Sequence, residues 1–368
     1  MTIVTHQDVF NKLEEWAPKQ LAYDWDPIGL QVGNVADNTS KILISLDVTD
    51  AVVDEAISKS CNLIIAHHPL LFKPLTSVNT STQKGSIVQK LIKHDITVYA
   101  SHTNLDIASG GVNDILAHKL NVLDVQPLVQ TASENLFKLV IHVPKSHTRK
   151  VREALGTAGA GFIGDYSHCT FQTEGVGTFK PLDGTNPFIG EKGKMAFVEE
   201  DKLETIIKEA DISSILKTLN EVHPYEEVAY DLYPVKQTGQ TFGLGRIGTL
   251  AEAATLGDLC ESVKDAFDMS HLRFTGNKDR LIKRVAIIGG SGEKYAQAAL
   301  KKGADVLITG DVNFHPAQDA IEMGLPIIDP GHYIEKAMKE AVKNYLNKQF
   351  LEIENVVSKV NTDPFHFM

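Results

Sequence analysis

Short, uninterrupted apolar runs are the feature that most constrains the fold of this 368-residue chain. The first third contains ILISL, NLIIA and ITVYA, and the last third contains VAII, VLIT and PII. Such runs are typical of strands buried on both faces of a parallel sheet. Amphipathic segments, such as residues 6–17 and 256–267, separate the runs and predict helices. We therefore expect an α/β fold at both ends of the chain, with right-handed crossovers.

The middle of the chain has a different pattern. Around 138–143 and 227–233, apolar and polar residues alternate, which is typical of strands with one solvated face. The predicted order is strand, helix (148–158), strand, strand, helix (212–222), strand, which is the split β-α-β unit of a ferredoxin-like fold. We expect residues 1–132 and 235–368 to form one α/β domain, and residues 133–234 to form an inserted α+β domain.

Composition excludes several classes of protein. The formal net charge is −11, which argues against nucleic acid as the main partner. No apolar run approaches the roughly 20 residues of a membrane span, and the N-terminus lacks the pattern of a signal peptide. Cys61, Cys169 and Cys260 are far apart, without a Cys-x-x-Cys pair, so we expect buried thiols and a cytoplasmic protein with a small-molecule partner.

Histidines and carboxylates follow several of the predicted strands. They are His67 and His68 after LIIA, His102 and Asp106 after VYA, Asp311 and His315 after VLIT, and His332 and Glu335 after PII. Ligands of open α/β sheets bind at the carboxyl ends of the strands, and a mixed imidazole and carboxylate set is typical of Zn, Mn or Fe sites. Taken alone, the pair at 67 and 68 could instead be a hydrogen-bonded loop. Together, the residues predict a metal site, and the adjacent pair reaches two ions more easily than one.

Other motifs allow two interpretations each. The segment 289–292 (GGSG) is either a phosphate-binding loop or a tight turn, and it lacks the lysine of a Walker motif. Asp311 and His315 belong to the site, or they are a helix cap and a hydrogen-bonded loop histidine. The segment 223–227 (HPYEE) is a second site or a turn with solvated carboxylates. We expect Trp25 to lie in the core.

Eight segments together resemble a known family. They are WDPIGLQVG, IIAHHPLLF, SHTNLD, GVGTFKPLDGTNPFIG, HPYEEVAYDLYP, AIIGGSG, TGDVNFH and DPGHYIE. In this order they resemble the Nif-three-like dinuclear-metal family, whose members are often named GTP cyclohydrolase 1 type 2 homologs. The resemblance covers the whole chain, and the middle segment is similar to the PII/CutA-like insert of the long bacterial form.

The resemblance implies an assembly and a metal site that spacing alone does not give. Members of the family are toroidal homohexamers with metal sites facing an internal cavity. By resemblance, each chain holds two divalent ions, zinc before manganese or iron. The implied ligands are His68, Asp106 and Glu335 for one ion, and His67, His332 and Glu335 for the other, with Glu335 bridging. His102 matches a family position near the metals.

Two functions remain open at this stage. In the first, the protein is a metal-dependent hydrolase, and the resemblance implies a GTP cyclohydrolase-like reaction in which a metal-activated water attacks C8 of guanine. His102 or His315 would move protons, because imidazole titrates near neutral pH. In the second, the protein is a non-catalytic hexameric metal-binding or regulatory scaffold. A ring around nucleic acid is disfavoured by the negative charge.

Overall fold

The chain forms two units, and the two ends of the chain build one of them. The computed structural model describes residues 3–368. Residues up to Ala132 form the first unit together with Phe242–Met368, and Ser133–Thr241 form the inserted unit. Both borders fall inside long strands, β5 (Leu123–Pro144) and β8 (Tyr230–Thr255). The second border follows Thr241, beyond the expected position 234, and both positions lie inside β8.

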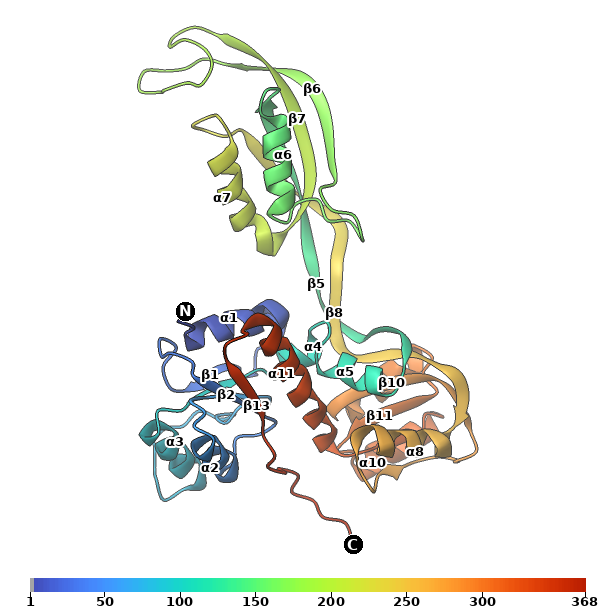
Figure 1. The fold of residues 1–368 in the computed structure, drawn as a ribbon. Helices are drawn as coiled ribbons and strands as arrows, with labels where there is room; N and C mark the ends of the chain where they lie inside the picture. Colours follow the sequence, from blue (N-terminus) through green and yellow to red (C-terminus); the bar gives the residue numbers. More distant parts are fainter. Residues whose placement is uncertain (1–2) are drawn as a thin grey trace. The chain divides into compact units, whose positions relative to one another are not determined.

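A five-stranded sheet contains the apolar runs of the first third (Figure 1). Its order is β1 (Gly29–Val32), β4 (Thr97–Ala100), β3 (Leu63–Ala66), β2 (Lys41–Ser45) and β13 (Glu354–Val357). All neighbours are parallel except β1 and β4. Every residue of β3 and β4 is buried, as the uninterrupted runs predict.

The runs of the last third form a second group of strands in the same unit. Next to β8 lie β10 (Leu281–Ser291), β11 (Val306–Gly310), β12 (Ile327–Asp329) and β9 (Arg273–Phe274), in that order. The strands β10, β11 and β12 are parallel. Their carboxyl ends therefore lie at one edge, where ligand sites of such sheets form.

Helices connect the strands of the first unit. The α-helices are α1 (His6–Trp16), α2 (Asp50–Ser58), α3 (Gln83–Lys93), α4 (Thr103–Ile107), α5 (Val112–Lys119), α8 (Leu256–Phe267), α9 (Ala296–Lys301), α10 (Phe314–Glu322) and α11 (Met338–Gln349). The 3₁₀ helices are η1 (Lys19–Leu21), η3 (Glu293–Tyr295) and η4 (His332–Ala337). Within residues 3–368, no helix combines the length and the apolar character that crossing a membrane requires.

The inserted unit has the predicted split β-α-β order. After β5 come α6 (Thr148–Thr157), β6 (Thr170–Phe179), β7 (Ala196–Lys208), η2 (Glu209–Asp211), α7 (Ile212–Val222) and β8. The strand order is β6, β7, β5, β8, and β7 is antiparallel to both β5 and β6. Residues of these strands and of α6 and α7 form a separate hydrophobic core, which includes Leu139, Val151, Leu203 and Leu219. The predicted fold class is confirmed.

Candidate metal centre

The side chains of the candidate centre come from strand ends of the first unit. His67 and His68 follow β3 directly, and Asp106 lies on α4, the short helix after β4. His332 and Glu335 lie on η4, which follows β12. η4 is a 3₁₀ helix, in which side chains three positions apart eclipse each other. His332 and Glu335 therefore face the same side.

Glu335 is the point on which these side chains converge. Its Oε2 lies 3.1 Å from Nε2 of His68, 3.1 Å from Nε2 of His332 and 3.9 Å from Nε2 of His67. Glu335 is only 2 % exposed. Gly290 makes room for it, because an added Cβ at this position would lie 2.9 Å from Glu335 Oε1.

Each of the three imidazoles is fixed through its other nitrogen. The pairs are His67 Nδ1 with the Ser101 carbonyl (2.8 Å), His68 Nδ1 with Asp47 Oδ1 (2.7 Å) and His332 Nδ1 with Asp311 Oδ2 (2.6 Å). Carbonyl and carboxylate oxygens only accept hydrogen bonds, so Nδ1 is the donor in every ring. In a neutral ring, Nε2 then has a free lone pair, which is the arrangement found in metal-ligating histidines.

Two buried atoms at the centre have no hydrogen-bond partner. They are His67 Nε2 and Asp106 Oδ1, which lie 3.5 Å apart. An unsatisfied buried polar atom costs about 1–3 kcal/mol, so a native fold rarely leaves two of them facing each other. A divalent cation would satisfy both atoms at once, and the residues present therefore fit a metal ion.

The electrostatics of the centre favour positive charge beside Glu335. Burial works against protonation of His68 and His332, but hydrogen bonds to the carboxylates on either side prevail. They raise the pKa of His68 to about 10 and that of His332 to about 9. Burial likewise opposes ionisation of Glu335, yet the surrounding imidazoles hold its pKa well below the usual range. The imidazole nitrogens and carboxylate oxygens around Glu335 therefore bind either protons or a metal ion.

Three groups of side chains could each hold a metal ion, with all ligand atoms of a group within 4.8 Å of one another. They are His67, Asp106 and Glu335; His68, His332 and Glu335; and His67, His68 and His102. Glu335 is shared by two groups, so it could contact an ion in each of them. The partners differ, because the structure places Asp106 with His67 and His332 with His68. The reason is that β3 pairs with β4, so His67 faces the segment after β4, whereas His68 turns toward Asp47 after β2.

The two histidines considered for proton transfer differ in position. His102 caps α4, and its Nδ1 lies 2.9 Å from Asp26 Oδ1. Burial disfavours the charge on Asp26, but hydrogen bonds from His102 and Thr103 outweigh it and lower the pKa of Asp26. His315 is exposed on α10, with Nδ1 3.2 Å from Gln318 Oε1, and it belongs to none of the three groups found in residues 3–368.

The glycine segment 289–292 covers the end of β10, where the pairing with β11 shifts register between Ile288 and Ser291. The Gly289 N–H donates to Asn113 Oδ1 (2.8 Å) and the Gly292 N–H donates to Thr309 Oγ1 (2.8 Å). Gly290 has a φ of +64°, which favours glycine. Because two of the four N–H groups are already bonded within the protein, the structure does not favour a phosphate-binding loop, and the segment is an irregular strand end rather than a tight turn.

Trp25 is not a core residue, contrary to expectation. It is 58 % exposed, because the neighbouring Asp26 turns inward to bind His102 and Thr103. Its ring stacks on Tyr23 with centroids 5.6 Å apart, and it lies 5.9 Å from Phe72 and 6.3 Å from His102. An exposed aromatic surface therefore adjoins the histidine cluster.

Sequence reasoning missed Asp26 and Asp47 as partners of the histidines. Asp47 occupies a position that could have been noticed, since it follows β2 as His67 follows β3. Asp26 gave no comparable signal, because its segment contains no buried strand end. Asp311, which the sequence left open, accepts a hydrogen bond from His332.

Comparisons with known proteins agree with the resemblance. A model of the Duf34/NIF3 (NGG1p interacting factor 3) family matches residues 4–364. Proteins named GTP cyclohydrolase 1 type 2 homolog are 50 % identical in Halalkalibacterium halodurans, over 100 % of both chains, and 46 % identical in Bacillus subtilis, over 99 % of both. A Bacillus cereus protein related to NIF3 has a similar structure, with 45 % identity, a TM-score of 0.95 and full coverage of both chains. A Staphylococcus aureus protein, fully covered at 34 % identity, gives a TM-score of 0.79. The chain therefore belongs to the Duf34/NIF3 family.

Proposed function

We propose that this protein binds two divalent metal ions and is a metal-dependent hydrolase. The observation that carries the proposal is the convergence of three imidazole Nε2 atoms and Asp106 on Glu335, with two buried ligand atoms left without partners. His67, Asp106 and Glu335 would hold one ion; His68, His332 and Glu335 would hold the other. Nitrogen and oxygen ligands suit zinc first, with manganese and iron as alternatives.

The residues around the centre have distinct tasks in such a reaction. When bound, the ions would supply Lewis acidity, lowering the pKa of a water and polarising a substrate oxygen. Hydrogen bonds fix the three imidazole rings: His68 donates to Asp47, His332 donates to Asp311, and His67 donates to the Ser101 carbonyl. Asp26 accepts the Nδ1–H of His102, which leaves the other ring nitrogen of His102 free to take up a proton.

For the substrate, we infer a nucleotide, and the named relatives suggest a GTP cyclohydrolase-like reaction at a guanine ring. Support comes from the exposed aromatic surface of Tyr23, Trp25 and Phe72 beside His102. Aromatic side chains bind bases by stacking, which contributes about 1–3 kcal/mol per base. A flat heterocycle on this surface would lie next to the histidine cluster.

The test is metal content and turnover on the same preparation. Protein purified without chelator, or reconstituted with zinc, manganese or iron, is analysed for metal and then assayed with GTP and other nucleotides for release of formate. We expect two ions per chain, and turnover that a chelator abolishes. His68→Ala should lose both, whereas His94→Ala, an exposed histidine at the end of α3, should lose neither. Less than one ion per chain after reconstitution would contradict the dinuclear centre.

Metal binding without turnover of any nucleotide would favour the alternative, a metal-binding or regulatory scaffold. We also propose the toroidal homohexamer that the resemblance implies, which light scattering of the intact protein tests directly.

The cytoplasm is the proposed location. Support for it comes from the three free thiols, which remain reduced most readily in a reducing compartment. Cys61 and Cys260 are buried as expected, whereas Cys169 is only half-buried.

A further inference from the structure

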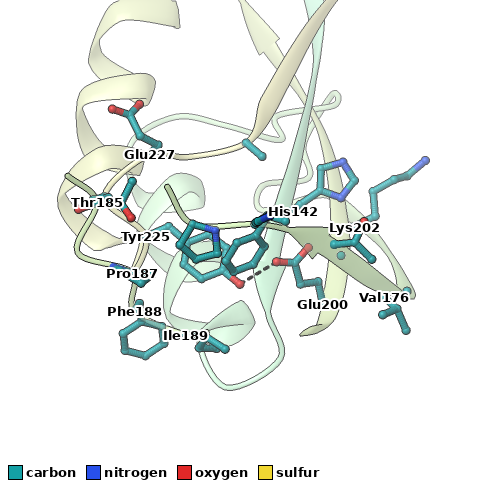
Figure 2. A pocket seen from close by; sticks show the side chains of 18 of the residues that line it. His142, Val176, Thr185, Pro187, Phe188, Ile189, Glu200, Lys202, Tyr225 and Glu227 are labelled. Carbon is teal, nitrogen blue, oxygen red and sulfur yellow. Dashed lines mark hydrogen bonds between the residues drawn. The ribbon is translucent and has the colours of Figure 1, made fainter. Parts of the chain in front are cut away.

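The inserted unit contains a cavity of about 770 Å³, which the metal centre does not use. Its walls come from β6, the loop after β6, β7, and the segment before β8 (Figure 2). Apolar side chains dominate these walls, among them Val176, Phe179, Leu182, Phe188 and Ile189. All residues around the cavity belong to the inserted unit. The volume lies in the range of small-molecule sites, about 300–1,000 Å³.

A buried carboxylate faces this apolar space. Glu200 on β7 is 6 % exposed, and its Oε1 accepts a hydrogen bond of 2.7 Å from the Tyr225 hydroxyl (Figure 2). Lys202, the nearest lysine on the same strand, lies 3.5 Å from Glu204 instead. Across residues 3–368, Glu200 has no ion pair with a basic side chain. A carboxylate can accept several hydrogen bonds, and the Tyr225 hydroxyl supplies only one of them, so a cationic group in the cavity could supply others.

Two glycines on β6 open space around this carboxylate. An added Cβ at Gly177 would lie 2.0 Å from Glu200 Oε2, so only glycine leaves the carboxylate its present position. Gly175 also lines the cavity, and an added Cβ there would meet no atom within 4 Å. Glycines within a strand often mark a close approach of a ligand.

Three aromatic rings line the cavity, and one of them, Tyr225, contacts the carboxylate. The Tyr225 ring centroid is 5.8 Å from that of Phe179 and 6.4 Å from that of Phe188. Burial and the neighbouring Glu200 raise the pKa of Tyr225, so its hydroxyl remains a donor at neutral pH. Glu226 accepts the Asn186 N–H at 2.9 Å and ties the loop to the segment before β8. A buried carboxylate and several aromatic rings in one cavity are groups that can bind an organic cation.

We propose that the inserted unit binds an organic amine with an apolar body. Its ammonium group donates to Glu200, and its body packs between Phe179, Phe188 and Tyr225. The charge around the cavity fits a cation better than a phosphate. Four glutamates and two lysines line it: Glu174, Glu200, Glu226 and Glu227, and Lys180 and Lys202. Of the glutamates, Glu174 is paired with Lys145, outside the lining. This site is independent of the proposed hydrolase activity.

Three probes with one ring and different head groups test the proposal on the intact protein: tryptamine, tryptophol and indole-3-acetate. Calorimetry should show that tryptamine binds at least about tenfold more tightly than tryptophol, because a hydrogen bond to a charged group contributes about 1.5–3 kcal/mol. Indole-3-acetate should not bind. Glu200→Gln should abolish the preference for tryptamine over tryptophol, and Phe188→Ala should weaken both probes equally.

Glu153→Gln is the matched control, because Glu153 is an exposed glutamate on α6 outside the cavity, paired with Arg149. It should bind all probes as the native protein does. Equal affinity of the native protein for tryptamine and tryptophol, or an unchanged preference in Glu200→Gln, would overturn the proposal. So would absence of tryptamine binding. A change of oligomeric mass in Phe188→Ala, with native binding of tryptamine, would instead assign the cavity to contacts between copies of the chain.

Discussion

Asp311 fixes the orientation of His332 from a backbone conformation that few residues adopt. Its Oδ2 lies 2.6 Å from His332 Nδ1, and its φ is +55°. The left-handed region costs a non-glycine residue about 1 kcal/mol or more, although aspartate tolerates it better than most. Gly310, just before it, passes so close to η4 that an added Cβ would lie 2.6 Å from the Gly331 and His332 backbone. The end of β11 is therefore shaped to place this carboxylate.

The first prediction concerns Asp311 itself. Asp311→Ala should lower metal affinity by about 10–100-fold, the range found when a partner of a metal-ligating histidine is removed. Asp311→Asn should stay closer to the native affinity, because the amide oxygen still accepts the Nδ1–H. Asp311→Gly should relieve the backbone conformation without restoring affinity. Zinc titration by calorimetry, with thermal unfolding alongside, separates these effects.

Asp319→Ala on α10 is the control for this series, because that carboxylate is exposed. It should bind zinc as the native protein does. If zinc affinity falls in parallel with thermal stability across the three variants, the role of Asp311 is purely structural.

The second prediction concerns Glu335. Its carboxylate would lie between two ions and partly neutralise their repulsion, so its loss affects the second ion more than the first. Glu335→Gln should bind one ion nearly normally and the other far more weakly, as measured by calorimetric titration. Two independent sites, one of them native-like even when both are filled, would show that Glu335 does not bridge. Glu340→Gln, an exposed position near Lys343, is the control.

The third prediction concerns Trp25. Because this side chain is 58 % exposed, Trp25→Ala should change the free energy of unfolding little. If nucleotides stack on it, the variant should lose about 1–3 kcal/mol of binding free energy, seen as a raised KM with unchanged metal content. Quenching of tryptophan fluorescence by GTP in the native protein, absent in Trp25→Ala, is an independent measurement. An unchanged KM in Trp25→Ala would show that nucleotides do not stack on Trp25.

Strong local patterns predicted most of the fold. The apolar runs that became β3 and β4 are buried at every residue, and α7 and α8 begin and end where the apolar spacing placed them. The elements that were missed are short. α4 has five residues, too few for the helical period to repeat in the sequence. β1 and β13 have four residues each and lie at the edges of the sheet. Such elements are determined by tertiary contacts rather than by local sequence.

The candidate site likewise has features that the sequence predicts and features that depend on tertiary structure. The strand-end rule pointed to His67 and His68, because direct attachment to a buried strand is visible in the sequence. Glu335 lies on η4, farther from the end of β12, and its spacing from His332 pointed to it. The pairing of Asp106 with His67 depends on which strands are neighbours, which one sequence does not contain. The exposure of Trp25 depends on the inward turn of Asp26, a single backbone choice without a periodic signal.

The fourth prediction concerns the independence of the first unit. Its hydrophobic clusters contain no residue of the inserted unit, whose own core lies around Leu139 and Leu203. Deletion of Ser133–Thr241, with a short glycine linker from Ala132 to Phe242, should therefore leave a folded protein that still binds metal. Circular dichroism and metal analysis test this. Aggregation or loss of metal would show that the unit needs the insert.

The last prediction concerns acid stability of the inserted unit, through His223. Its Nδ1 accepts the Tyr225 N–H (3.1 Å), and its Nε2 lies 3.1 Å from the His142 carbonyl, so the ring is neutral with the proton on Nε2. Burial lowers its pKa below 6.5; the His142 carbonyl and the charge of Glu200 oppose this shift, and His147 adds to it. Protonation would break the bond from Tyr225.

The sign of the pH effect follows from this shift. Below about pH 6.5, His223 becomes protonated in the unfolded chain but stays neutral in the folded unit, because folding lowers its pKa. The stability that the neutral ring contributes is therefore fully present above pH 6.5. It is lost as the pH falls below that value. We expect amide hydrogen exchange in α7 to accelerate between pH 7 and pH 5, after correction for intrinsic rates, more than in α11. His223→Gln should flatten that dependence, because glutamine can accept from Tyr225 and donate to His142 without titrating. Equal pH dependence in the variant and the native protein would contradict the role of His223.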